Sequence, residues 1–370
     1  MTTTSRRHFL AGTAAAAGAT VVLSRTGLAG AAAPNAGRSL VVIYLRGGAD
    51  GISLFAPLGD PAYRTARPTV GVQTATARAL TGPGANSYFA FHPQAARLSA
   101  LYNAGRMAVV PVAGLPAINR SHFDAQAMME AGSFGQGFGT GWAGRWLEST
   151  KATSDSVLRS VGFGSTTPAS LRGYPSMIAY SLDNLSLLDW GPSRAQVRAN
   201  TADSLSRPGV HPLLQSWVEP TLDTVDSLAT LGSTALPDTW PHTRAGRGLW
   251  PVARLIQAGF PVEFGHVDMD GWDTHSGMGS PDEPTATMSS QVVELDTAIG
   301  AFVDLIGPAI DSTTIVVMSE FGRRARENSS GGADHGTAFP MLVIGGAPDP
   351  AWSAGGPGWR RTSSSTTTSA

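Results

Sequence analysis

The sequence of 370 residues contains no cysteine. This absence excludes disulfide bonds, thiolate nucleophiles, and zinc or iron–sulfur sites with sulfur ligands. Any bound metal ion would therefore need Asp, Glu or His side chains, or hydroxyl groups, as its ligands. If the protein enters an oxidising compartment, its lack of disulfide bonds indicates that it folds before export.

Charged residues are also scarce, at 14% of the chain, and Lys151 is the only lysine. The 26 basic and 27 acidic side chains nearly cancel, which does not favour binding to nucleic acid or to an anionic membrane. Long apolar runs are missing as well. Because no segment offers ~18 uninterrupted apolar residues, we expect no membrane-spanning helix.

The N-terminal segment has the pattern of a twin-arginine export signal. Residues 5–10 (SRRHFL) precede a weakly apolar run, and the small residues at 29–31 suit a cleavage site. We predict a signal peptide over residues 1–31 and a linker over 32–38. The twin-arginine translocation machinery would then export the protein, which would be periplasmic or secreted. The competing interpretation is an unstructured Ala-rich tail with a chance arginine pair.

Short apolar runs alternate with segments of helical periodicity along the rest of the chain. We predict strands at 40–45, 106–112, 261–267, 313–318 and 339–344, and helices at 95–104, 121–131, 248–258 and 288–306. The pattern predicts an α/β fold with a mainly parallel sheet, in one domain over residues 39–346. Within it, we interpret residues 132–144 as a Gly-rich loop and about 150–245 as an irregular insertion.

Three of the predicted strands run directly into acidic residues, and a later loop adds an Asp-His pair. In open α/β sheets, ligand sites form beyond the carboxyl ends of the strands, so these side chains would gather along one rim. The candidate metal ligands are Asp50, Asp273, His275, Glu320, Asp334 and His335. Carboxylate and imidazole ligands suit Zn, Mn or Mg, and suit Ca less well, so we predict a divalent metal site.

These candidates also have structural interpretations that the sequence leaves open. Asp50 lies in a Gly-Gly-Ala-Asp-Gly run that is typical of a turn. The acids of residues 268–273 suit a solvated loop, and Glu320 suits an ion pair with Arg323 or Arg324.

Ser121 has two interpretations as well. The run SHFD at residues 121–124 fits a capping box that opens a helix. The same position suits a nucleophile, because a helix N-terminus stabilises a developing oxyanion. The candidates to bind an anionic ester are Arg46, Arg120 and the group of Arg323, Arg324 and Arg326. No Gly-x-Ser-x-Gly elbow, Walker A loop or dinucleotide fingerprint is present, which argues against a serine esterase, an NTPase and a dehydrogenase.

Six motifs occur in order and together resemble one bacterial family. They are LVVIYLRGGADG (40–51), RSHFDAQ (120–126), GWAGRWL (141–147), GWDTH (271–275), MSEFGRR (318–324) and GADHG (332–336). Over residues 38–346 the chain resembles the twin-arginine-exported family called domain of unknown function 1501, which is related to the alkaline phosphatase and sulfatase superfamily. The resemblance implies an alkaline-phosphatase-like, three-layer α/β/α domain with metal-assisted chemistry on phosphate or sulfate esters.

The resemblance also implies roles for single residues. Asp50 stands where the superfamily has its first-strand metal aspartate, and Ser121 stands near the place of the nucleophile. Asp273 and His275 are similar to the central Asp/His metal pair, although their spacing is tighter. His335 is similar to the final metal histidine.

The chain departs from the family pattern in two places. Residues 319–322 read Ser-Glu-Phe-Gly where the superfamily has Ser-Asp-His-Gly. Glu320 keeps a ligand, but Phe321 removes one, so a single-metal site is easier to assemble than a two-metal site. Residues 347–370 form a Ser- and Thr-rich tail without a packing pattern. We expect this tail to be disordered and the C-terminal part of the fold to be truncated, which would expose a sheet edge.

Three functional hypotheses follow. The first is an exported metal-dependent hydrolase in which the metal polarises the ester and lowers the pKa of Ser121, while arginines hold the anion. The second is an exported binding or scaffold protein without turnover, motivated by Phe321. Its Trp-rich segments would line a carbohydrate or envelope polysaccharide surface. The third is a truncated, non-functional product.

Overall fold

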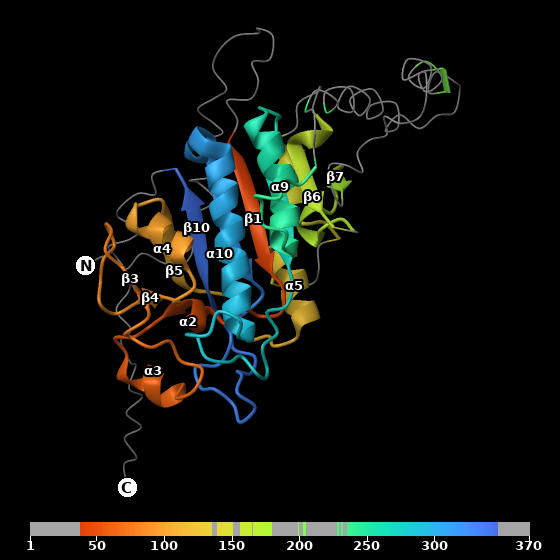
Figure 1. The fold of residues 1–370 in the computed structure, drawn as a ribbon. Helices are drawn as coiled ribbons and strands as arrows, with labels where there is room; N and C mark the ends of the chain where they lie inside the picture. The colour runs from red at the N-terminus through yellow and green to blue at the C-terminus, as the bar shows by residue number, and fades with distance from the viewer. Residues whose placement is uncertain are drawn as a thin grey trace, which may run out of the picture. The chain divides into compact units, whose positions relative to one another are not determined.

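A seven-stranded sheet forms the centre of the described structure, in the order β5-β10-β9-β1-β8-β6-β7 (Figure 1). Its strands are β1 (Ser39–Leu45), β5 (Met107–Ala113), β6 (Ser160–Phe163), β7 (Met177–Ala179), β8 (Phe264–Met269), β9 (Thr313–Ser319) and β10 (Phe339–Gly345). Neighbouring strands are parallel except that β10 runs antiparallel to both β9 and β5. The predicted mainly parallel sheet is confirmed.

This computed structural model describes residues 38–134, 139–150, 156–164, 166–179 and 235–346, with a few isolated positions between 199 and 231. The predicted signal peptide, the Ser- and Thr-rich tail and most of the predicted insertion lie outside the described residues. Among the helices of the described part, none combines the length and the apolarity that crossing a membrane requires.

Helices cover both faces of the sheet. On the face toward the viewer in Figure 1 lie α4 (Ala96–Asn103), α9 (Arg244–Gln257) and α10 (Thr287–Ile306). On the opposite face lie α5 (His122–Ala131), α6 (Trp142–Ser149) and the 3-10 helix η2 (Ala169–Leu171). The predicted three-layer α/β/α arrangement is therefore confirmed.

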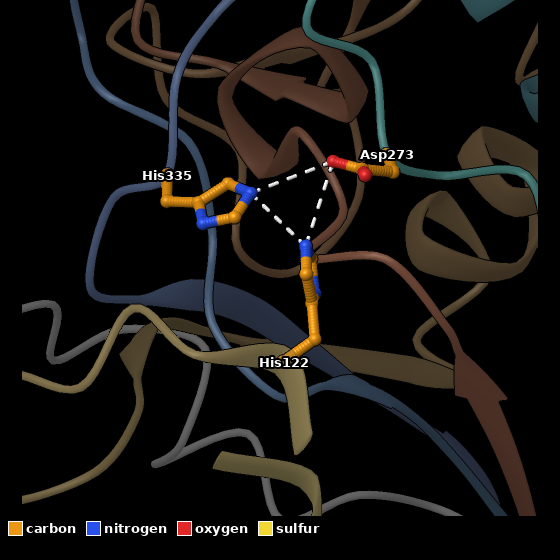
Figure 2. Close-up of side chains that lie close together, drawn as sticks. All are labelled: His122, Asp273 and His335. Atoms are coloured by element: carbon orange, nitrogen blue, oxygen red, sulfur yellow. Dashed lines mark hydrogen bonds and ion pairs between the residues drawn. The ribbon is translucent and has the colours of Figure 1, made fainter. Parts of the chain in front are cut away.

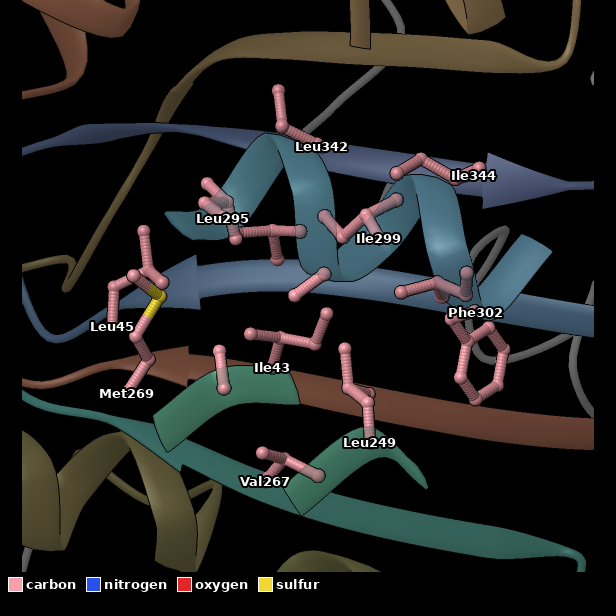
Figure 3. Close-up of a cluster of buried hydrophobic side chains, with 14 of the residues drawn as sticks. Ile43, Leu45, Leu249, Val267, Met269, Leu295, Ile299, Phe302, Leu342 and Ile344 are labelled. Carbon is pink, nitrogen blue, oxygen red and sulfur yellow. The ribbon is translucent and has the colours of Figure 1, made fainter. Parts of the chain in front are cut away.

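The larger hydrophobic core fills the space between the sheet, α9 and α10 (Figure 3). Ile43 of β1 packs there with Leu249 of α9 and Ile299 of α10. On the other face of the same strand, Val42 packs with Leu147 of α6. Because both faces are covered, β1 is a continuous apolar run. Burying each such side chain contributes ~1.5–3 kcal/mol.

The segment between β1 and α4 folds into small elements. They are α2 (Gly51–Leu54), α3 (Pro61–Ala66) and a three-stranded sheet of β2 (Phe55–Ala56), β4 (Ala90–Phe91) and β3 (Arg78–Ala79). Two further 3-10 helices are η1 (Val157–Arg159), before β6, and η6 (Gly307–Ser312), before β9. The sequence patterns predict none of these short elements.

The structure differs from the sequence prediction in and around the expected insertion. β6 and β7 belong to the central sheet, although they lie within the segment interpreted as irregular. These strands are too short for an apolar pattern to stand out. α6 begins inside the predicted Gly-rich loop, with Gly141 as its N-cap. α9 begins at Arg244 because the Thr243 side chain accepts a hydrogen bond from the Gly246 N–H.

The topology gathers four loops at one edge of the sheet. β1, β5, β8 and β9 run in the same direction, so their carboxyl ends lie together. The reversed strand β10 begins at that edge. The loop between β9 and β10 therefore meets the loops that follow β1, β5 and β8, and ligand sites form at this edge in such sheets.

Candidate metal centre

Three imidazoles and one carboxylate converge at this edge. Nε2 of His335 lies 3.0 Å from Nε2 of His122 and 2.7 Å from Nε2 of His275. Oδ1 of Asp273 lies 3.2–3.5 Å from all three nitrogens. Figure 2 shows His122, Asp273 and His335 pointing toward a common centre. Among the described residues, the ligand atoms of His122, Asp273 and His335 all lie within 4.8 Å of one another, which is close enough to share a metal ion.

The outer nitrogen, Nδ1, of each imidazole has an acceptor behind it. The acceptors are the Glu320 carboxylate for His122 (2.8 Å), the Asp334 carboxylate for His275 (3.3 Å) and the Arg120 carbonyl for His335 (2.8 Å). A neutral imidazole carries one proton, so a proton donated outward from Nδ1 leaves a lone pair on Nε2. If all three imidazoles carry their proton on Nδ1, three lone pairs face one another and repel unless a cation lies between them. This donor set fits a metal ion.

A polar stripe on α5 supplies one side of the centre. His122, Gln126 and Glu130 recur every four residues and so share one face of the helix. His122 and Gln126 both contact Oε1 of Glu320, at 2.8 and 3.0 Å. Phe123, by contrast, is 87% exposed. The helix therefore turns a polar face toward the sheet edge and leaves a large apolar side chain in solvent.

Glu320 follows β9 directly and is fully buried. Its Oε1 also accepts a hydrogen bond from the Gly47 N–H at 2.9 Å, and its Oε2 accepts one from the Ser319 hydroxyl at 3.1 Å. These donors fix the carboxylate, which in turn orients His122. The role of Glu320 is thus to position a ligand.

Asp273 is held by a buried arginine. Nη2 of Arg323 donates to Oδ1 of Asp273 at 2.5 Å. Partial burial acts to raise the pKa of the Asp273 carboxyl, but the bond and charge of Arg323, with help from His122 and His275, bring the pKa below its ordinary value. The carboxylate is therefore ionised at neutral pH, which is the form that binds metal.

Phe321 lies beneath two of the imidazoles, with its ring centroid 4.9 Å from those of His122 and His335. The ring leaves room only for glycine at position 48, where φ is +64° and a Cβ would come within 2.2 Å of the ring.

Burial lowers the pKa of His335, and the charge of Arg323 lowers it further. His335 is thus neutral at neutral pH, as a ligand must be.

Three of the six predicted metal ligands, Asp273, His275 and His335, meet in the cluster. Asp334 lies behind it, as Glu320 does. Hydrogen bonds from Asn328 and His275 lower the pKa of the exposed Asp334 carboxyl. Asp334 therefore orients His275 through its Nδ1.

Asp50 is not part of this centre, contrary to the prediction. Its side chain is fully buried and forms an ion pair with both terminal nitrogens of Arg67, while Oδ2 also accepts a hydrogen bond from Ser53 at 3.1 Å. Arg67 in turn donates to the carbonyls of Arg324 and Ala325. The pair thus anchors the loop after β9.

Arg46 and Arg323, predicted to bind an anionic ester, are engaged elsewhere. Arg46 donates to Asp268 at 2.7 Å and to Glu130 at 2.8 Å. Burial acts to raise the pKa of Asp268, but His266 and Arg46 bring it down to about 2. Arg46 therefore joins α5 to β8 rather than facing a substrate.

Ser121 is the N-cap of α5. Its hydroxyl accepts a long hydrogen bond, 3.4 Å, from the Asp124 N–H, and the residue is exposed. This geometry matches the capping interpretation and leaves the hydroxyl accessible.

The sequence interpretation missed His122 as a metal ligand. The capping pattern explains the residues around it and hides its second role. A signal was present in the repeat of His122, Gln126 and Glu130, which places three polar residues at intervals of four on one face of the helix.

Residues 113–355 match the family described as protein of unknown function (DUF1501), and this is more than half of the chain. The chain belongs to that family, and the resemblance is confirmed. No curated protein matches the sequence.

Three solved structures are similar to this chain. The first is the C-terminal periplasmic domain of EcEptC from Escherichia coli, in complex with Zn, with 8% identity, a TM-score of 0.36, and coverage of 86% of this chain and 76% of that one. The second is Ps i-CgsB in complex with k-i-k-neocarrahexaose, with 12% identity, a TM-score of 0.30, and coverage of 83% and 66%. The third is a provisionally named sulfatase from Bacteroides thetaiotaomicron VPI-5482, with 12% identity, a TM-score of 0.25, and coverage of 84% and 64%.

Proposed function

We propose that this protein is an exported, metal-dependent hydrolase of phosphate or sulfate esters. The observation that carries the proposal is the convergence of three Nε2 atoms and one carboxylate oxygen at the carboxyl edge of the sheet. The twin-arginine pattern at residues 5–10 supports export into the periplasm or the medium.

The ligand set favours a borderline transition metal. Mg²⁺ and Ca²⁺ prefer oxygen ligands, whereas three imidazole nitrogens and one carboxylate suit Zn²⁺ or Mn²⁺. Such an ion, when bound, polarises an ester oxygen and stabilises the charge that develops in the transition state.

Two exposed arginines are candidates to hold the anionic ester. The Arg120 carbonyl accepts from His335, and the Arg324 N–H donates to the Asp334 carbonyl at 2.8 Å, so both backbones touch the centre. Within the described part of the chain, neither guanidinium forms a hydrogen bond or an ion pair. Of the arginines that the sequence analysis named as candidates to bind the anion, we assign this role to Arg120 and Arg324. The exposed Ser121 beside Arg120 remains the candidate nucleophile.

The alternative function is a non-catalytic scaffold that keeps the fold. The capping role of Ser121 favours it, because a cap needs no chemistry. The proposed carbohydrate surface gains little support, since Trp240, Trp250 and Trp272 are buried. Trp142 and Trp146 are half-buried and pack against the core beside α6. Trp190 lies outside the described residues.

Metal analysis of the purified protein, followed by an ester panel, tests the proposal. After chelation and reloading with Zn²⁺, Mn²⁺, Mg²⁺ or Ca²⁺, we expect Zn²⁺ or Mn²⁺ to be retained and to support turnover of aryl phosphate or aryl sulfate. His122→Ala should lower metal affinity at least ~10-fold and abolish turnover.

His242→Ala is the matched control, because His242 is an exposed histidine whose Nε2 contacts a backbone carbonyl outside the cluster. Equal metal content in the His122→Ala variant and the native protein would refute the metal centre. Metal retention without turnover of any ester would instead support the scaffold.

A further inference from the structure

Arg323 occupies a cage of oxygen atoms next to the histidine cluster. Its Nε donates to the Gly48 carbonyl at 2.6 Å. Its side chain is fully buried. The remaining acceptors are the carbonyls of Gly47, Trp272 and Ala333 and the Oδ1 atom of Asp273. Four carbonyls and a carboxylate are the kind of ligands that a hard cation takes in proteins. Here a guanidinium, which is always charged, fills that place.

The charges beside the cluster disfavour two divalent ions. Asp273, Glu320 and Asp334 contribute three negative charges, whereas Arg323 acts on Asp273 and Arg324 acts on Asp334, which adds two positive charges. Two divalent ions would bring four positive charges to a surplus of one negative charge, and the second ion would lie beside the buried guanidinium.

We infer that the Arg323 guanidinium acts as a permanent second cation of this centre, so that the cluster takes a single divalent metal ion. This inference rests on the metal centre of the proposed function. It adds the number of metal ions that the centre binds and names Arg323 as the residue that determines this number. Arg323 is a positioning residue: it holds Oδ1 of Asp273, which lies within 3.2–3.5 Å of the three imidazole nitrogens. It also ties the loops after β1 and β8 to the loop before β10.

Zinc titration of the full chain tests the inference. The native protein should bind one equivalent of Zn²⁺, measured by elemental analysis and by calorimetry. Arg323→Ala should lower the zinc affinity ~10–100-fold, because Asp273 loses its support. Millimolar guanidinium ion, or Ca²⁺, should restore much of that affinity by filling the emptied oxygen cage. Arg323→Lys, which keeps the charge, should also bind one equivalent.

Arg326→Ala is the control, because Arg326 is an exposed arginine in the same loop, and its zinc affinity should equal that of the native protein. Two equivalents of Zn²⁺ in the native protein would overturn the inference. So would unchanged zinc affinity in a folded Arg323→Ala variant, or a loss that neither guanidinium nor Ca²⁺ reverses. If Arg323→Ala does not fold, the number of Zn²⁺ ions bound by the native protein and by the Arg323→Lys variant tests the inference instead. None of these readouts depends on ester turnover, so they remain informative even if the protein is not a hydrolase.

Discussion

At the residue scale, the centre depends on what lies behind each imidazole. A histidine side chain can rotate, and either nitrogen can carry its proton, so an isolated histidine is a poorly defined ligand. The Glu320 carboxylate fixes both properties of His122, and the Arg120 carbonyl does the same for His335. Partners of this kind contribute ~10–100-fold to metal affinity in other proteins. The residues that bind the ion are thus only part of the site.

Asp50 provides a prediction about folding stability rather than about metal binding. Asp50→Asn should leave metal content unchanged but lower the free energy of unfolding by ~3–5 kcal/mol, because it leaves the charge of Arg67 buried and uncompensated. Urea unfolding and elemental analysis of the same sample measure the two effects.

Asp304→Asn serves as the control for Asp50→Asn. Asp304 pairs with Arg97 at the surface, with side chains 66% and 47% exposed, so this change should cost less than ~1 kcal/mol. Loss of metal from the Asp50→Asn variant would contradict this prediction and would show that Asp50 contributes to metal binding.

At the element scale, α5 is organised by its first turn. The Ser121 cap starts the helix at His122, and the start point decides which residues face the sheet edge. Gln126 and Glu130 follow on the same face. At the other end, Gly132 ends the helix in the left-handed conformation, with φ of +59°. The residues at which the helix begins and ends are therefore both fixed by local hydrogen bonds and backbone conformation.

Two substitutions at Ser121 separate its capping role from a chemical one. Ser121→Ala should lower the free energy of unfolding by ~0.5–2 kcal/mol through loss of the cap, whereas Ser121→Asp, which also caps, should restore it. If the hydroxyl is the nucleophile, both variants should lose ester turnover while keeping their metal. Thermal melting, metal analysis and a turnover assay give the three readouts. Full turnover by Ser121→Asp would exclude the hydroxyl from the chemistry.

At the scale of the whole molecule, an ion in the cluster would join three segments: the start of α5, the loop after β8 and the loop between β9 and β10. Ligands that bind only the folded state stabilise it, by ~2.7 kcal/mol at a free concentration 100 times the Kd. Zn²⁺ should therefore raise the Tm of the protein, and a chelator should reverse the shift. The His275→Ala variant should show a smaller shift at the same zinc concentration. An equal shift in that variant would point to zinc binding elsewhere.

The main elements of the fold could be predicted from the sequence because burial on both faces leaves a continuous apolar run, as in β1 and β9. The short strands β6 and β7 could not, since three or four residues carry no readable pattern. For the site, Asp273, His275 and His335 stood beyond strands or beside an acid. Asp50 also follows a predicted strand, so the sequence does not distinguish it from the metal ligands. Only the fold shows that it pairs with Arg67 instead. His122 was hidden by a capping motif that explains the same residues.

The cluster joins positions that are far apart along the chain, since His122 and His335 are separated by 213 residues. Closing such a loop requires β5, β9 and β10 to have already paired in order, and contacts of this range form late and slowly. A partly folded chain would offer scattered histidines and hold an ion only weakly. Metal occupancy would therefore report that folding is complete, which would be a useful checkpoint if the protein is exported in its folded state, as the twin-arginine pattern predicts.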